Sequence, residues 1–133
     1  MDKKRSYYFE RSAAIIAALI LMQTLYFKFT AHPDSVHIFS KIGGEPYLRI
    51  GSGIVELIIG LLLLYPKTSL IGAILGIGVM FGAIGQHVFV LGIEVNNDGG
   101  SLFTLALITF ICCSLVLIIK RKAIVNSLSK NKL

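Results

Sequence analysis

The chain has 133 residues, of which 55% are hydrophobic and 15% are charged, and its formal net charge is +6. A soluble domain of this length carries more charge and breaks its apolar residues into short amphipathic patches, so the composition excludes that class and predicts a single all-α membrane domain. The basic residues lie at the ends of apolar segments, not in a stripe with interleaved aromatic residues, so nucleic acid is not an expected partner.

Four apolar segments are long enough to cross a bilayer, because a hydrocarbon core of about 30 Å takes roughly 20 helical residues at about 1.5 Å each. They cover residues 12–29, 47–65, 69–91 and 101–119. Pro66 ends the second segment, since proline has no N–H with which to continue a helix. Backbone groups at membrane depth must be satisfied within each segment, which predicts an integral membrane four-helix bundle.

The first segment also resembles a secretory signal, because the charged MDKKR precedes the apolar AAIIAALILM. No A-x-A cleavage site follows, and the bulky LYFKF stretch is a poor substitute for one. These features favour a retained span over a cleaved signal.

The distribution of lysine and arginine indicates the orientation, because these residues accumulate in cytoplasmic segments. Ten of the 13 lie on the side of the two termini and the 66–68 turn: Lys3, Lys4, Arg5, Arg11, Lys67, Lys120, Arg121, Lys122, Lys130 and Lys132. Only Lys28, Lys41 and Arg49 lie on the other side. We therefore expect a multi-pass protein of the bacterial inner (cytoplasmic) membrane, with both termini cytoplasmic and residues 30–46 and 92–100 outside.

Glycines on the third span predict close helix packing, because lipid tails solvate large apolar side chains as well as another helix does. They form two GxxxG pairs, Gly72 with Gly76 and Gly78 with Gly82. We expect the stripe of Gly78 and Gly82 to be buried against another helix of the same chain; a homodimer face is the alternative. Cys112 and Cys113 are adjacent within an apolar run, which favours a packing role over a redox or metal-binding role.

Glu56 is the most informative polar residue. It lies nine residues inside its span, which is about 13 Å deep at helical rise. A charge at such depth costs near 3 kcal/mol or more, so we expect Glu56 to face the bundle interior with a hydrogen-bond partner. Arg49, Ser52 and Gly53 share its helix face.

Several other polar residues lie in the outer halves of the spans. With Glu56, the set predicted to form a ligand-binding pocket or polar network is Gln23, Lys28, Arg49, Glu56, Gln86 and His87. One interpretation is an outward-facing pocket for a small ligand, a quinone head group or a proton, with Glu56 and His87 titrating. The other is a hydrogen-bond network that only holds the bundle together. The sequence lacks HxxxH and a second intramembrane carboxylate, so no metal site is expected.

The segment from QTLYFKFTAHPDSVHIFSKIGGEPYLRIGSGIVELIIG to the histidine before LGI and the D-G-G turn resembles the DoxX family of small bacterial membrane proteins. The resemblance runs from about Gln23 to Lys122. It implies a four-helix membrane bundle. The residues that match the family pattern are Gln23, Lys28, Glu45, Arg49, Glu56 and His87. Members of the family and the similar MauE proteins are associated with thiosulfate:quinone oxidoreduction, with maturation of methylamine dehydrogenase and, in animals, with receptor assembly.

Two functional hypotheses follow. The first is a non-catalytic subunit or assembly factor of a redox or envelope system, whose partners are membrane lipid and another membrane or envelope protein. The second is a direct binder or carrier of a small apolar or quinone-like ligand in the outward pocket. No catalytic residues and no tightly held cofactor are expected in either case, although a quinone or lipid is a possible ligand in the second.

Overall fold

The computed structural model describes residues 3–95 and 98–131, and within them the chain is helical with no strand. The elements are α1 (Lys3–Phe29), α2 (Pro33–Lys41), α3 (Tyr47–Leu64), α4 (Ser69–Gln86), a π-helical turn η1 (His87–Leu91) and α5 (Ser101–Asn131). Four stretches are long and apolar enough to cross a membrane: Lys3–Phe29, Tyr47–Leu64, Ser69–Leu91 and Ser101–Lys122. The predicted all-α bundle with four candidate spans is therefore confirmed.

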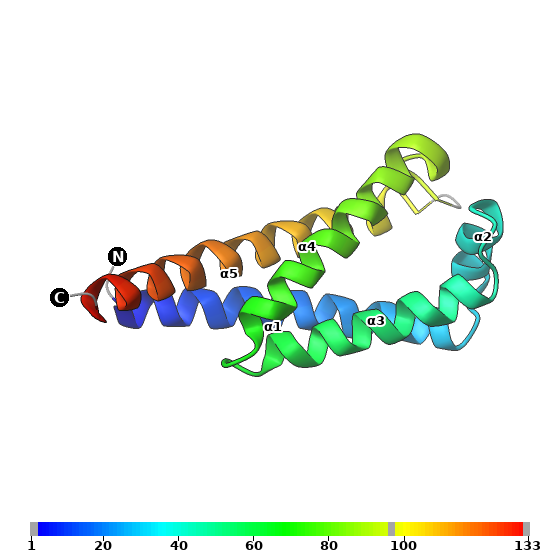
Figure 1. Cartoon of the computed structure of the whole chain (residues 1–133). Helices are drawn as coiled ribbons and strands as arrows, with labels where there is room; N and C mark the ends of the chain where they lie inside the picture. Colours follow the sequence, from blue (N-terminus) through cyan, green and yellow to red (C-terminus); the bar gives the residue numbers. More distant parts are fainter. Residues whose placement is uncertain (1–2, 96–97, 132–133) are drawn as a thin grey trace.

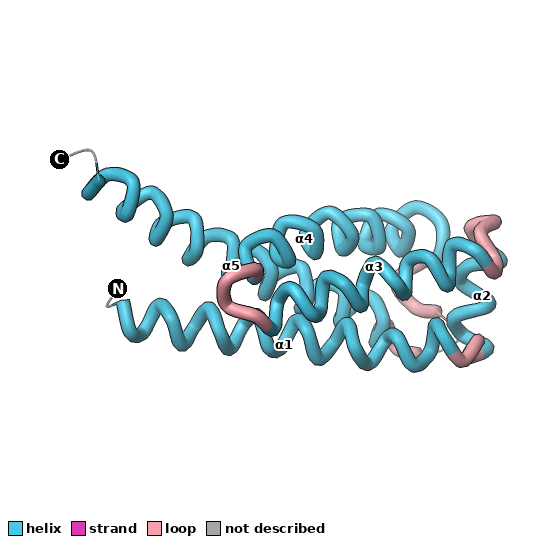
Figure 2. The backbone as a smooth tube through the Cα atoms, turned by 60° about the horizontal axis from the view of Figure 1, so that its bottom comes forward, coloured by secondary structure: helices cyan, strands magenta, loops and turns pink. Residues whose placement is uncertain are grey.

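The helices form an elongated bundle with both ends of the described chain at the same end (Figure 1). Helix α1 contacts α3 and α5, and α4 contacts the same two helices. The short helix α2 lies at the opposite end, where it closes the bundle (Figure 2). From the turn after α3, α4 rises away from α3, so the two helices are close only near that turn (Figure 1).

The bundle core is built on small residues of α1. Ala14, Ala17 and Ala18 are fully buried at helical spacing, which lets the backbones of neighbouring helices approach closely. Larger side chains from α3 and α5 fill the remaining space, among them Ile59, Leu63, Cys113 and Val116. The two cysteines are free thiols inside this core, which fits the packing role expected from the sequence.

The glycines of α4 divide into two groups. A Cβ added at Gly72 would lie 3.0 Å from backbone of α3, and one at Gly76 would lie 2.7 Å from Sγ of Cys113. A Cβ at Gly78 or Gly82 meets no described atom within 4 Å. The prediction that the Gly78 and Gly82 stripe is buried within the chain is therefore wrong. At roughly 100° per residue this stripe lies about 120° around α4 from Gly72 and Gly76, so it faces outward when those two glycines face the neighbouring helices.

Three helical stretches lie outside the predicted spans, one of them the end of α5, which continues to Asn131 instead of ending at residue 119. Helix α1 begins at Lys3 instead of residue 12, and α2 occupies part of the segment predicted as a loop. Helix α2 starts with Pro33 in its first turn, and Nδ1 of His32 accepts a hydrogen bond from the backbone N–H of Asp34 at 3.2 Å. Proline suits this position because its missing N–H has no intrahelical partner to lose. At only nine residues, α2 is too short to show a clear helical period.

Candidate ligand-binding site

The carboxylate of Glu56 and the ammonium of Lys28 form a buried ion pair between α3 and α1. Nζ of Lys28 donates a hydrogen bond to Oε1 of Glu56 at 2.6 Å, and Glu56 is 5% exposed. Lys28 lies in the last turn of α1, where its charge also suits the helix C-terminus. The prediction that Glu56 faces the bundle interior with a polar partner is confirmed. The pairing leaves no net charge at this depth, which lowers the cost of placing either group there.

Thr24 and Phe39 complete the surroundings of this pair. The hydroxyl of Thr24, one turn before Lys28, lies 3.1 Å from Oε2 of Glu56 and 2.7 Å from the carbonyl oxygen of Leu21. Nζ of Lys28 lies 5.5 Å from the ring centroid of Phe39 on α2, within the range of a cation–π contact. Helices α1, α2 and α3 therefore all contribute to holding the ammonium.

Arg49 holds the framework around the pair and does not contact Glu56. Its Nε lies 2.9 Å from both carboxylate oxygens of Glu45, one helical turn earlier. Its Nη1 donates to the backbone carbonyl of Lys28. Arg49 thus links the start of α3 to the end of α1 and fixes the position of the Lys28 backbone.

His87 is the first residue of η1, the turn that follows α4. The side chain is buried, its Nδ1 lies 3.0 Å from the carbonyl oxygen of Gly92, and its ring packs edge-on against Phe103 at 5.6 Å between centroids. Gly92 has φ +83°, a conformation that glycine adopts without steric cost. The chain reverses direction at Gly92, which places the Gly92 carbonyl within hydrogen-bonding distance of the His87 ring.

A cavity of about 130 Å³ lies between these groups and is bordered by all the helices. Its polar wall consists of Thr24, Lys28, Glu56, His87 and Thr109. The rest of the wall is apolar, with Ile20, Leu21, Ile38, Met80, Ala83, Leu102, Leu105 and Ala106. An apolar cavity of about 150 Å³ holds one benzene molecule, so this space suits a single six-membered ring. The cavity is thus a small, half-open, largely apolar space with a charged, hydrogen-bonding side.

An open apolar groove of about 530 Å³ lies next to the cavity. It is lined by Phe39, Leu48, Gly51, Ser52, Val55 and Val79. Phe39 of the groove wall lies beside Lys28 of the cavity wall, with 5.5 Å between the ring centroid and Nζ. Helices α2, α3 and α4 border both the cavity and the groove.

The six residues predicted for the site fall into three groups. Lys28, Glu56 and His87 line the cavity. Arg49 is not in the cavity wall; it bonds the backbone carbonyl of Lys28, which is part of that wall. Gln23 and Gln86 are on the outer surface of the bundle; each is adjacent in sequence to a cavity residue, and a step of one residue along a helix turns the side chain by about 100°.

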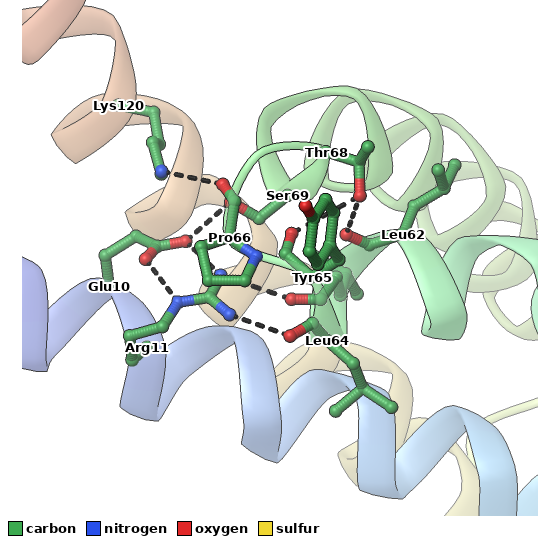
Figure 3. Close-up of polar contacts among 10 residues, drawn as sticks. Glu10, Arg11, Leu62, Leu64, Tyr65, Pro66, Thr68, Ser69 and Lys120 are labelled. Atoms are coloured by element: carbon green, nitrogen blue, oxygen red, sulfur yellow. Dashed lines mark hydrogen bonds and ion pairs between the residues drawn. The ribbon is translucent and has the colours of Figure 1, made fainter.

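Sequence reasoning missed a second polar cluster, which lies at the turn between α3 and α4 (Figure 3). Glu10 is 1% exposed and accepts hydrogen bonds from Arg11 at 2.6 Å and 2.7 Å and from the hydroxyl of Ser69 at 2.7 Å. Nζ of Lys120 donates to the carbonyl of Pro66 at 2.9 Å. Glu10 is the one acidic residue in the basic stretch of residues 3–11, and that isolation was the available signal.

This cluster supplies hydrogen-bond donors to the last carbonyl groups of α3. Proline has no N–H to bond the carbonyl four residues earlier, and the hydroxyl of Thr68 takes that place by donating to the carbonyl of Leu62 at 2.8 Å. Arg11 donates to the carbonyls of Leu63 and Leu64 at 3.2 Å and 3.0 Å. Last-turn carbonyls need such partners wherever water is scarce. The cluster therefore has a structural task, and it lies apart from the cavity.

The loop that follows η1 is organised by Asp98. Its carboxylate accepts backbone hydrogen bonds from Val95 at 3.0 Å, Gly100 at 2.8 Å and Leu102 at 3.2 Å. Partial burial acts to raise the pKa of Asp98, but these three N–H groups and the nearby His87 outweigh it and hold the pKa below its usual value. Asp98 thus fixes the start of α5 beside the histidine.

Comparison of the chain with protein-family models, with curated proteins and with solved structures found no match.

Proposed function

We propose that this chain is a non-catalytic membrane protein that binds a small, largely apolar ligand with a polar ring in the cavity beside Lys28 and Glu56. The observation that carries the proposal is the cavity itself: about 130 Å³ of space walled by apolar side chains and by a buried ion pair. A network that served only to hold helices together would not need that space, because helix interfaces are otherwise close-packed. Apolar pockets with a few convergent polar groups are typical small-molecule sites.

The neighbouring groove supports a ligand that also has an apolar tail. The groove is open and its wall is almost wholly apolar, so a hydrocarbon chain would lie there at little cost in desolvation. A quinone-like or other isoprenoid lipid combines a ring of the right size with such a tail. The wider proposal is that the chain is DoxX-like, and the support is that Lys28, Glu56 and His87 all border the cavity.

The orientation proposed with this function has both termini on the cytoplasmic side of a bacterial inner membrane. The excess of lysine and arginine near the two termini and the turn after α3 supports it. In that orientation, α2 and the cavity lie in the outer half of the bilayer.

The proposal is tested by extracting the chain from native membranes in mild detergent and identifying bound small molecules by mass spectrometry. Ala106 borders the cavity, so Ala106→Leu fills part of it and is expected to remove the co-purifying molecule. Leu107→Phe enlarges the next side chain, which faces outward, and serves as the matched control. Retention of the same molecule at the same level by Ala106→Leu would refute binding in the cavity.

A second candidate function is a subunit or assembly factor that binds another membrane protein. The observation that favours it is the outward stripe of Gly78, Gly82 and Gly85 on α4, none of which would place a Cβ within 4 Å of a described atom. Small residues on a lipid-facing helix permit close approach of a partner helix. If this function holds, Gly82→Leu removes a co-purifying membrane protein and Ala106→Leu does not; the reverse pattern supports the ligand.

A further inference from the structure

The hydrogen bond of His87 fixes which nitrogen of its ring holds the proton. Nδ1 lies 3.0 Å from the carbonyl oxygen of Gly92, and a carbonyl oxygen can only accept. In the neutral imidazole the proton is therefore on Nδ1, and Nε2 has a free lone pair. The edge-on packing of the ring against Phe103 holds it in this orientation.

Nε2 of His87 makes no hydrogen bond to any residue that the structure describes, while the ring itself forms part of the cavity wall. The other polar groups of that wall each have a partner, although the ammonium of Lys28 uses only one of its three N–H donors on Glu56. Thr109 donates to the carbonyl of Leu105 at 2.9 Å, and Glu56 already has the ammonium of Lys28 and the hydroxyl of Thr24 beside it. Nε2 of His87 is thus an acceptor that no described residue engages, and it is not sealed off, because no fully buried nitrogen or oxygen of the described side chains lacks a hydrogen-bond partner.

From this arrangement we infer that the ligand carries a hydroxyl group on its ring and donates that hydrogen bond to Nε2 of His87. The inference rests on the proposed function and narrows its ligand class to ring alcohols of the phenol type, which fit a space of about 130 Å³. A ring with carbonyl or ether oxygens alone cannot satisfy Nε2, because those oxygens only accept.

Phenol and toluene are suitable probes, because they have similar size and differ in the hydroxyl group. Their binding to the whole chain in lipid nanodiscs is measured calorimetrically at one fixed pH, with empty nanodiscs subtracted for partitioning into lipid. The quantity of interest is the ratio of the phenol affinity to the toluene affinity. Comparing this ratio between variants cancels the different hydration of the two probes.

His87→Asn is the informative variant. Its side-chain amide can still donate to the carbonyl of Gly92, but it offers no acceptor at the position of Nε2. We expect the ratio to fall roughly tenfold, as the loss of one hydrogen bond predicts. Ala106→Leu is expected to abolish binding of both probes.

The outcomes separate the two proposals. If both probes bind and His87→Asn leaves the ratio unchanged, the hydroxyl inference is wrong and the cavity remains a ligand site. If neither probe binds above empty nanodiscs, or Ala106→Leu changes nothing, the cavity proposal fails. A measurement that needs no variant is the ¹⁵N resonance of histidine Nε2, which should move on adding phenol and not on adding toluene; equal movement with both probes also overturns the inference.

Discussion

The ion pair of Lys28 and Glu56 determines how substitutions at the cavity affect stability. Their side chains are 15% and 6% exposed, so water gives each charge little help once the other is removed. Breaking a buried pair from one side costs about 3–5 kcal/mol, whereas replacing both partners by apolar residues is often neutral. The pair is therefore expected to show strong coupling.

We predict that Lys28→Met and Glu56→Leu each lower the free energy of unfolding by about 3 kcal/mol, because each leaves an unpaired buried charge. The double variant should recover most of that loss. Thermal unfolding of all four proteins in one detergent gives the coupling energy. Additive losses in the double variant would mean that the two charges do not depend on each other.

Asp98 gives a prediction with a definite pH dependence. Its folded pKa lies below the usual value, so its carboxylate stabilises the fold above the unfolded pKa of about 3.9, and this contribution is lost as pH falls through the folded pKa. Asp98→Asn should therefore lower stability at pH 7 by about 1 kcal/mol, as for a lost helix-cap interaction. The difference between variant and parent should shrink below about pH 4. A difference that stays constant with pH would show that the charge is unimportant.

Single residues differed in how far the sequence could place them. Glu56 was predicted to be buried with a polar partner because a charge at membrane depth leaves few alternatives. Thr24 was not predicted, because a threonine in an apolar helix commonly bonds its own backbone. Gln23 and Gln86 were grouped with the site by depth alone, and depth does not specify the direction of a side chain around the helix.

Among the elements, α4 shows most clearly what an apolar pattern leaves open. Both of its GxxxG pairs have the spacing of a packing face, but only Gly72 and Gly76 have neighbours close enough to require glycine. The two pairs lie about 120° apart around the helix at roughly 100° per residue, so packing of Gly72 and Gly76 on α3 and α5 leaves Gly78 and Gly82 facing outward. The sequence therefore shows two possible packing pairs, and only the tertiary structure shows which of them packs against another helix.

We predict that Gly72→Leu destabilises the fold strongly, because its Cβ would lie 3.0 Å from backbone of α3 and backbone cannot move aside as a flexible side chain does. The expected loss is about 3 kcal/mol or more, at the upper end of overpacking substitutions. Gly82→Leu should change the melting temperature little in detergent, since open space surrounds that position. A comparable loss in both variants would indicate that α4 packs on another helix along its whole length.

At the level of the whole molecule, the number of spans and their approximate limits follow from hydropathy, because a bilayer imposes both length and composition. The packing partners of each span do not follow, since Leu-rich faces suit lipid and protein equally. For the same reason the sequence predicted three residues of the cavity's polar wall, Lys28, Glu56 and His87, but not the apolar residues opposite them.

The proposed orientation predicts which single cysteines react in intact cells. His37→Cys on α2 should react with a membrane-impermeant thiol reagent, and Lys67→Cys in the turn after α3 should react only after the cells are broken. Both positions are exposed, while the native Cys112 and Cys113 are buried and give a low background. Reaction of Lys67→Cys alone in intact cells would reverse the topology.

The turn at Pro66 also bears on how the chain is assembled during synthesis. Arg11, which bonds the last carbonyls of α3, is made before the turn, whereas Lys120 follows Pro66 by 54 residues. While the ribosome is still making α5, the carbonyl of Pro66 therefore lacks the Lys120 contact. The hairpin of α3 and α4 reaches full hydrogen bonding at this end only when the last span has been inserted beside the first. Membrane insertion of the final helix thus completes a turn that lies in the middle of the chain.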